Sequence, residues 1–315
     1  MTDTYNYDDV KPVQIRSDEP ELCQILYDDE YEHTMGILLA LMRDKEYSER
    51  ALHITEQGIE LLASHYTIWY YRFEILTTLN KNLFDELDWV EQIALENQKN
   101  YQIWNYRQLL VEKIIESGAD FSPYREYPLL GEMLEEDVKN HHVWSYRKWL
   151  VERFDLFHAP KEVSFVNSKI DEDVRNNSAW THRHFLLFGK PSLVDETLVN
   201  DEVEYVKMKI ELCPQNASSW TYLLGIYRRA KKPLGELHEF CLQFANGMAE
   251  SESTADTDES QDKAEVKSSF ALEMLARIYV EQKEIAKAKR AYTLLADKYD
   301  PIRKNYWEYQ KSVIV

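Results

Sequence analysis

Five tryptophans recur along this chain at nearly constant intervals. Trp69, Trp104, Trp144, Trp180 and Trp220 are separated by 35, 40, 36 and 40 residues. With each Trp taken as position zero, position −4 is Asn in the last four units and position +3 is Arg in the first four. Position +2 is Tyr in every unit except the fourth, where it is His. A period of this length with several aligned columns predicts a stack of repeated helical units.

Each unit reads as two helices joined by a short turn. Before each of the last four tryptophans, positions −17, −14 and −10 lie on one helical face, and most of them are apolar, as in Leu87, Val90 and Ala94. After the Trp, apolar residues at +6 and +7 continue a second helix, and the Asn at −4 is placed to cap it. Stacked pairs bury these faces together, with Trp as the large packing residue. The Arg at +3 shares the Trp face and is expected to bond the carbonyl end of an adjacent helix.

The composition supports an all-α fold and excludes several functions. Eight glycines and nine prolines in 315 residues supply too little turn chemistry for a β-sandwich or barrel. The net charge of −19 repels nucleic acid and anionic membranes. Three widely separated cysteines without a CxxC pair are typical of a reducing compartment. No apolar run approaches the ~18 residues of a spanning helix and no apolar leader begins the chain, so we expect a cytoplasmic protein that does not span a membrane.

The two ends of the chain depart from the repeat. Residues 1–20 are rich in Asp and Tyr and are expected to form an extended arm, and residues 21–315 a single helical-repeat domain. The stretch 249–265 is acidic, rich in Ser and Thr and nearly free of large apolar side chains, which predicts a disordered loop. Three closing helices are expected after it.

A cation precedes the second helix in three consecutive units. Position −5 holds Lys99, Lys139 and Arg175, whereas the outer units have Ser64 and Gln215. A cation is unfavourable beside the positive end of a helix, so three of them in an acidic chain indicate an anion bound across neighbouring turns, and a diphosphate is a good candidate. The alternative is that these cations form ordinary surface pairs with Glu and Asp of neighbouring helices. The sequence alone leaves both open.

The neighbours of these cations locate the candidate site. Positions −3 and −2 hold large side chains that donate hydrogen bonds or titrate in the first three units, beginning at Tyr66, Tyr101 and His141, and small polar ones afterwards. Elsewhere, His182 and His184 are two residues apart and point to different helical faces, which argues against a shared metal. The chain contains no GxGxxG, GxxxxGK[ST], HExxH or GxSxG motif.

The columns Asn-x-x-x-Trp-x-Tyr-Arg resemble the repeats of the protein prenyltransferase α-subunits. The stretches DDVKPV, KNYQIWNYR, DVRNNSAWTHR and DPIRKNYWEY are similar, in order and over nearly the whole chain, to the α-subunit shared by farnesyltransferase and geranylgeranyltransferase type I. The resemblance implies a right-handed superhelical crescent of stacked helical hairpins. A Rab-type geranylgeranyltransferase α-subunit, which has the same repeats but is usually longer, is one alternative. A non-catalytic helical-repeat scaffold that binds peptides is the other.

The resemblance also implies roles for individual residues. Lys99, Tyr101 and His142 are expected to stabilise the departing diphosphate, and Gln102 to hold the terminal carboxylate of the peptide. Tyr66 is expected near the pocket for the last peptide residue. The remaining substrate-binding residues come from the turn before Trp144, where the usual Tyr of the family is replaced by His: Lys139, Asn140 and His141.

A partner subunit is part of the same implication. The resemblance implies a β-subunit of farnesyltransferase or geranylgeranyltransferase type I, which binds the catalytic Zn²⁺, so no metal site is expected in this chain. Mg²⁺ is expected to assist the farnesyltransferase form. The co-substrate is an isoprenoid diphosphate, and the acceptors are proteins that end in a Cys-a-a-X motif.

Overall fold

The computed structural model describes residues 5–16, 22–23, 25–245 and 266–314. The loop expected at 249–265 lies outside this range, as do residues 1–4 and 17–20 of the expected arm. Contacts between Cα atoms divide the chain into two units, Met1–Leu150 and Val151–Val315, so the single domain expected over 21–315 stays a prediction. Within the described residues, no helix is both long and apolar enough to cross a bilayer.

Apart from one isolated β-bridge between Ala245 and Val266, all regular secondary structure in the described residues is helical. This confirms the all-α prediction. The first unit contains α1 (Asp29–Arg43), α2 (Glu49–Leu61), α3 (Tyr66–Thr78), α4 (Leu83–Glu96), α5 (Tyr101–Glu116), α6 (Tyr127–Glu136) and most of α7 (His141–Arg153). The second contains α8 (Pro160–Glu172), α9 (Asn177–Phe188), α10 (Glu196–Leu212), α11 (Ala217–Ala230), α12 (His238–Leu242), α13 (Ser269–Glu281), α14 (Ile285–Leu294) and α15 (Lys304–Val313).

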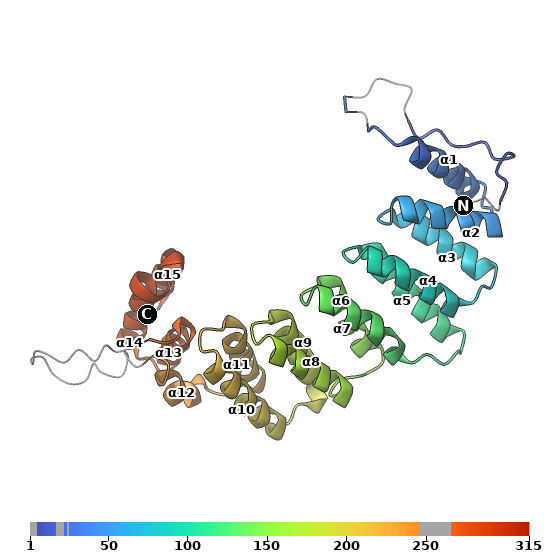
Figure 1. Cartoon of the computed structure of the whole chain (residues 1–315). Helices are drawn as coiled ribbons and strands as arrows, with labels where there is room; N and C mark the ends of the chain where they lie inside the picture. Colours follow the sequence, from blue (N-terminus) through green and yellow to red (C-terminus); the bar gives the residue numbers. More distant parts are fainter. Residues whose placement is uncertain (1–4, 17–21, 24, 246–265, 315) are drawn as a thin grey trace, which may run out of the picture. The chain divides into compact units, whose positions relative to one another are not determined.

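Helical hairpins follow one another in sequence order within the first unit (Figure 1). The predicted stripe before Trp104 is confirmed, since Leu87, Val90 and Ala94 are all buried on α4. The predicted Asn caps are confirmed too. Asn100, for example, accepts hydrogen bonds from the backbone N–H groups of Gln102 and Ile103. Each second helix therefore begins at a fixed residue after its turn.

The repeated Trp fastens this turn as well as filling the core. The indole N–H of Trp69 donates to the carbonyl of Ala63 at 2.8 Å, and that of Trp144 to the carbonyl of Val138 at 3.0 Å. In the second unit Trp180 and Trp220 make the same bond to the residue six positions earlier. A buried indole keeps its donor satisfied in this way, and the turn is held against the first helical turn.

A buried ion cluster joins successive hairpins. The Arg72 guanidinium on α3 donates to both carboxylate oxygens of Glu86 on α4, at 2.6 and 2.9 Å, and the Tyr106 hydroxyl on α5 donates to the same carboxylate at 2.8 Å. Arg72 also donates to the carbonyl of Leu52 at 3.2 Å. The arginine does bond a carbonyl of an adjacent helix, but Leu52 lies in the first turn of α2 and not at its carbonyl end as expected. The principal partner of the +3 arginine is a buried glutamate, because a desolvated guanidinium requires a counter-charge.

The same cluster recurs one hairpin later and again in the second unit. Arg107 on α5 donates twice to Glu126 Oε2, at 2.9 and 2.7 Å, and the Tyr146 hydroxyl on α7 donates to that oxygen at 2.9 Å. The corresponding residues of the second unit are linked in the same pattern: Arg183, Glu202 and Tyr222.

The second unit ends in the three expected closing helices, α13, α14 and α15. The end of α14 widens into a π-helical turn over Leu295–Tyr299. Trp307 on α15 is fully buried, and its indole N–H donates to Asp300 at 3.0 Å. The C-terminal Trp thus repeats the packing role of the earlier ones.

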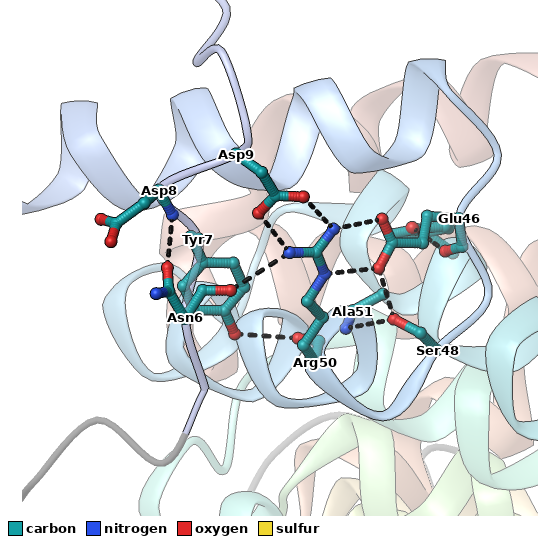
Figure 2. Close-up of polar contacts among 9 residues, drawn as sticks. Asn6, Tyr7, Asp8, Asp9, Glu46, Ser48, Arg50 and Ala51 are labelled. Carbon is teal, nitrogen blue, oxygen red and sulfur yellow. Dashed lines mark hydrogen bonds and ion pairs between the residues drawn. The ribbon is translucent and has the colours of Figure 1, made fainter.

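The N-terminal arm is fastened to the first helices through Arg50 (Figure 2). The Arg50 guanidinium pairs with Asp9 of the arm and with Glu46, and the Tyr7 hydroxyl donates to the Arg50 carbonyl at 2.9 Å. Farther along, a Cβ atom at Gly36 would lie 3.0 Å from the Val13 carbonyl oxygen, so the close approach of the arm to α1 favours glycine there. The described part of the arm, residues 5–16, contains no helix, as expected.

Candidate functional site at the turns before α5 and α7

The turns that precede α3, α5 and α7 carry the candidate site, and all three lie in the first unit. Tyr101 and His142 occupy the first turns of α5 and α7, and their rings contact each other edge to face, with centroids 4.3 Å apart. Lys99 stands two residues before Tyr101. Lys99 is also near enough to His142 for its charge to lower the pKa of that imidazole, so the structure brings together the three residues expected to contact the departing diphosphate.

The geometry of these turns follows from Asn140. Its side-chain oxygen accepts from the backbone N–H groups of His142, at 3.0 Å, and Val143, at 3.4 Å. Its amide donates to the carbonyl of Gln98, at 3.1 Å, in the turn before α5. Asn140 is 2% exposed, so this side chain fixes one turn against the next. The oxygen and the nitrogen of this amide both already have hydrogen-bond partners within the chain. The expected contact of Asn140 with substrate stays a prediction.

Lys99 stands at the edge of an open depression. Its side chain is 77% exposed, and its Nζ lies 3.4 Å from a carboxylate oxygen of Asp137 in the following turn. The depression has a volume of about 760 Å³, and its lining includes Lys99, Tyr101, Gln102 and Glu136. The pairing with an acid of the next repeat matches the alternative drawn from the sequence. An exposed pair of this length is weak, so Asp137 leaves the ammonium free to turn toward a more highly charged anion.

The electrostatics of His142 follow from this crowding. Partial burial lowers the pKa of His142 below its ordinary value of 6.5, and the nearby His141 and Lys99 lower it further. The imidazole is therefore neutral at neutral pH. The combination of Lys99, a phenol and an imidazole supplies a fixed charge and two adjustable hydrogen-bond donors.

Lys139 and His141 are both exposed on the same turn. The Lys139 backbone N–H donates to Asp137 at 3.1 Å, and its ammonium makes no ion pair within the described chain. His141 Nε2 lies 3.4 Å from the Ser145 hydroxyl, and the His141 ring is 5.8 Å from that of His142. His141 thus adjoins the Tyr101–His142 contact. Contact of Lys139 and His141 with substrate stays a prediction.

A second, more apolar hollow lies between α3 and α5. Its volume is about 320 Å³, and Tyr66, Tyr70, Leu109 and Gln102 are part of its lining. Gln102 borders both hollows, so it stands between the charged depression and the apolar one. Tyr66 and Tyr101 are 73% and 69% exposed, which leaves an aromatic surface open.

The motifs identified in the sequence do not predict the buried glutamates that stand 18 residues before a repeated Trp. Glu86, Glu126, Glu162 and Glu202 all stand 18 residues before a Trp, so an aligned column did mark them. Glu162 faces His182, which replaces the usual Tyr, at 3.4 Å. Among the described residues, no three His, Cys, Asp or Glu side chains are grouped as metal ligands.

Comparison with known proteins agrees with this geometry. The family model for the protein prenyltransferase alpha subunit repeat matches residues 48–79, 83–114, 123–154, 159–189 and 199–230. Each match spans one helical hairpin, and together they cover about half of the chain.

Curated relatives and a solved structure extend the match to the whole chain. The chain is 56% identical over 315 residues to the protein farnesyltransferase/geranylgeranyltransferase type-1 subunit alpha of Candida albicans, covering 99% of this chain and 98% of the relative. It is 38% identical over 256 residues to the subunit of the same name from Schizosaccharomyces pombe, covering 78% and 84%. The solved Candida albicans protein geranylgeranyltransferase-I complexed with GGPP superposes with a TM-score of 0.91 at 55% identity, covering 99% of this chain and 100% of that one.

Proposed function

This chain belongs to the protein prenyltransferase alpha subunit family, and from that premise we propose that it is the α subunit of a heterodimeric CaaX protein prenyltransferase. The enzyme transfers a farnesyl or geranylgeranyl group from its diphosphate to the C-terminal Cys thiolate of a substrate protein. A close structural relative is a geranylgeranyltransferase-I complexed with GGPP, which supports an isoprenoid diphosphate as the co-substrate.

One observation carries the proposal at the level of residues. The exposed ammonium of Lys99 lines an open depression beside Tyr101, whose ring in turn contacts His142. In a chain of net charge −19, this grouping offers a local site for an anion. The pair with Asp137 is the only ion pair of Lys99 in the described chain, and a diphosphate would compete with it through several negative oxygens.

These residues act on the leaving group. The substrate thiolate forms a bond to C1 of the isoprenoid while the C1–O bond breaks, and the electron pair of that bond leaves with the diphosphate. Negative charge therefore grows on the phosphate oxygens in the transition state. A cation from Lys99 and donors from Tyr101 and His142 stabilise that charge most strongly at this point, which lowers the barrier.

The peptide end of the substrate belongs to the neighbouring hollow. Gln102 borders both hollows and can donate to the terminal carboxylate of the peptide from its amide. Tyr66 lies across the apolar hollow from α5 and can contact the last side chain. We further propose that Lys139, Asn140 and His141 complete the diphosphate end from the turn before α7.

The remaining chemistry belongs to a partner. We propose a β subunit of farnesyltransferase or geranylgeranyltransferase type I, which holds the Zn²⁺ that activates the thiol, with Mg²⁺ assisting farnesyl transfer. The exposed aromatic surface around Tyr66, Tyr70 and Tyr101 is suited to a partner chain. The enzyme is proposed to act in the cytoplasm on proteins with a Cys-a-a-X end.

Reconstitution tests the proposal. The chain is co-expressed with each of the two β subunits, and transfer from farnesyl and geranylgeranyl diphosphate to a Cys-a-a-X peptide is measured. We expect a complex and transfer with at least one β subunit. A stable complex without transfer in any combination would identify a non-catalytic scaffold instead, and failure to bind either β subunit would overturn the proposal.

A further inference from the structure

Buried clusters around Glu86 and Glu126 link the helices that carry the two halves of the proposed site. The Glu126 cluster joins α5 to α7 through Arg107 and Tyr146. The Glu86 cluster joins α3 to α5 through Arg72 and Tyr106. All of these side chains are buried. The helices that these glutamates connect are the ones whose first turns carry the site residues.

We propose that Glu86 and Glu126 are positioning residues with separate targets: Glu126 sets the diphosphate end of the site and Glu86 sets the peptide end. This inference rests on the proposed function. Through α5 and α7, Glu126 fixes the distance between Tyr101 and His142. Through α3 and α5, Glu86 fixes the distance between Tyr66 and Gln102.

The distances along the helices make this coupling direct. Arg107 lies six residues beyond Tyr101 on α5, which is about 9 Å along the helix axis. Tyr146 lies four residues beyond His142 on α7, about 6 Å. A helix of this length moves as a rigid body, so a shift at the cluster appears at the first turn. The ring of Trp104 against that of Tyr146, with centroids 5.1 Å apart, is a second link between α5 and α7.

The carboxylate charge is what holds each cluster together. Burial alone would lower the pKa of Arg107, and the Glu126 carboxylate raises it, so the guanidinium stays charged. Burial raises the pKa of Tyr146 well above its ordinary value, and the nearby Glu126 charge adds to this, so its hydroxyl stays a donor. The second oxygen of Glu126 has no hydrogen-bond partner in the described structure. All three donated bonds therefore converge on one atom, and the loss of any one of them moves the others.

The second unit provides matched controls. Arg183, Glu202 and Tyr222 form the same buried cluster, and Trp180 packs on Tyr222 with centroids 4.9 Å apart, as Trp104 packs on Tyr146. None of these residues belongs to the proposed site. A substitution here removes the same chemical group from the same kind of cluster, so it reports the cost of damaging the repeat alone.

The experiment uses the complex of this chain with the geranylgeranyltransferase type I β subunit. The variants are Glu126→Gln and Tyr146→Phe at the diphosphate end, Glu86→Gln at the peptide end, and Glu202→Gln and Tyr222→Phe as controls. Equilibrium binding gives the Kd for geranylgeranyl diphosphate, steady-state transfer gives KM for a Cys-a-a-X peptide, and urea titration gives stability. Tyr146→Phe keeps the buried ion pair and thus the fold, so it decides the outcome if Glu126→Gln does not assemble.

We expect the two ends to separate. Glu126→Gln and Tyr146→Phe should raise the Kd for geranylgeranyl diphosphate by about tenfold with a smaller change in peptide KM, and Glu86→Gln should show the reverse. The controls should lose comparable stability with both constants unchanged. Equal changes in site variants and controls would overturn the inference while leaving the proposed function intact. A wild-type complex that neither binds geranylgeranyl diphosphate nor transfers it would overturn the proposed function itself.

Discussion

The ring of Tyr101 stands at 84° to the imidazole of His142, with the two centroids 4.3 Å apart. This contact joins two turns that lie about forty residues apart in the sequence, and it places a phenol and a titratable imidazole beside the ammonium of Lys99. The groups that face His142 are Tyr101 from α5, His141 from its own helix and Lys99 from the preceding turn, with Asp137 partly offsetting the lysine.

We first predict that His142 makes diphosphate binding depend on pH. Partial burial, His141 and Lys99 lower the pKa of His142, so the imidazole is neutral above pH 6.5 without ligand. A bound diphosphate favours the protonated form, and its affinity should therefore rise as pH falls from about 7.5 to about 6. His142→Gln should flatten this dependence. Titration of geranylgeranyl diphosphate into the wild-type and His142→Gln complexes at several pH values checks this. The ionisation of the ligand itself affects both complexes equally, so the difference between them reports His142.

The same pKa has a consequence for stability. Because the folded protein binds a proton at His142 less readily than the unfolded chain, His142 opposes folding as pH falls below 6.5 and has no effect well above it. His142→Gln should thus reduce the acid sensitivity of the urea midpoint. His184 in the second unit is the matched control, since burial lowers its pKa as well. His184→Gln should reduce acid sensitivity without changing the pH dependence of ligand binding. If His184→Gln and His142→Gln changed the pH dependence of ligand binding equally, the first prediction would be contradicted.

A second prediction concerns Asn140. Asn140→Ala removes a helix cap, which is worth about 0.5–2 kcal/mol, and leaves the Gln98 carbonyl without this donor. We expect a corresponding fall in the urea midpoint. Asn216 has the same two roles, since it accepts from the Ser218 N–H at 3.1 Å and donates to the Val174 carbonyl at 2.6 Å.

The comparison separates structure from substrate contact at Asn140. Asn216→Ala should lose a similar amount of stability and leave the Kd for geranylgeranyl diphosphate unchanged. Asn140→Ala should weaken that binding by several-fold, because the turn that carries His141 and His142 loosens. Equal ligand affinity in the two variants would show that Asn140 acts only on stability.

The parts of the fold that depend on local sequence could be predicted from it. The Trp column, the apolar spacing of Leu87, Val90 and Ala94 and the Asn caps all follow from residues within one hairpin. These are short-range effects of helical periodicity and of unsatisfied N–H groups, so a single sequence contains them.

The parts of the fold that depend on contacts between hairpins could not be predicted from the sequence. The sequence predicts a carbonyl partner for the +3 arginine and misses the glutamate, because the glutamate stands on the next hairpin, 19 residues beyond Arg107 in the case of Glu126. The sequence does contain a column of Glu at position −18, but the stacking of the hairpins decides that this column contacts the +3 arginines. The same holds at the site, where Lys99 meets Asp137 and Tyr101 meets His142 across the stack.

A third prediction is that the chain needs its partner in solution. Three tyrosines on this surface are more than half exposed: Tyr66, Tyr70 and Tyr101. The first two border the apolar hollow together with Leu109, and Tyr101 borders the charged depression. Expressed alone, the chain should aggregate, and co-expression with a β subunit should yield a soluble 1:1 complex. Size-exclusion chromatography with light scattering checks this, and a monodisperse monomer in the absence of a partner would count against an obligate complex.

Substitution at the same surface sharpens that test. Tyr70→Ser with Leu109→Ser should make the isolated chain more soluble and weaken its assembly, because both side chains contribute apolar area to the surface. Leu193→Ser, at another exposed leucine in the second unit, is the control and should change neither property. Weakened assembly in the control alone would place the interface elsewhere.

The last prediction addresses the cation itself. Lys99→Ala should lower kcat by ~10²-fold with assembly intact, which is comparable to the loss of one preorganised donor to a developing negative charge. Steady-state kinetics of the complex measure this. Arg175→Ala removes the equivalent cation one repeat beyond Lys139 and should leave kcat unchanged. Asp137→Asn distinguishes the two interpretations of Lys99, because it removes the partner found at 3.4 Å. If the lysine served only that surface pair, Asp137→Asn would reduce kcat as much as Lys99→Ala. If the lysine serves the diphosphate, Asp137→Asn should keep kcat or raise it, since the ammonium no longer has a competing carboxylate.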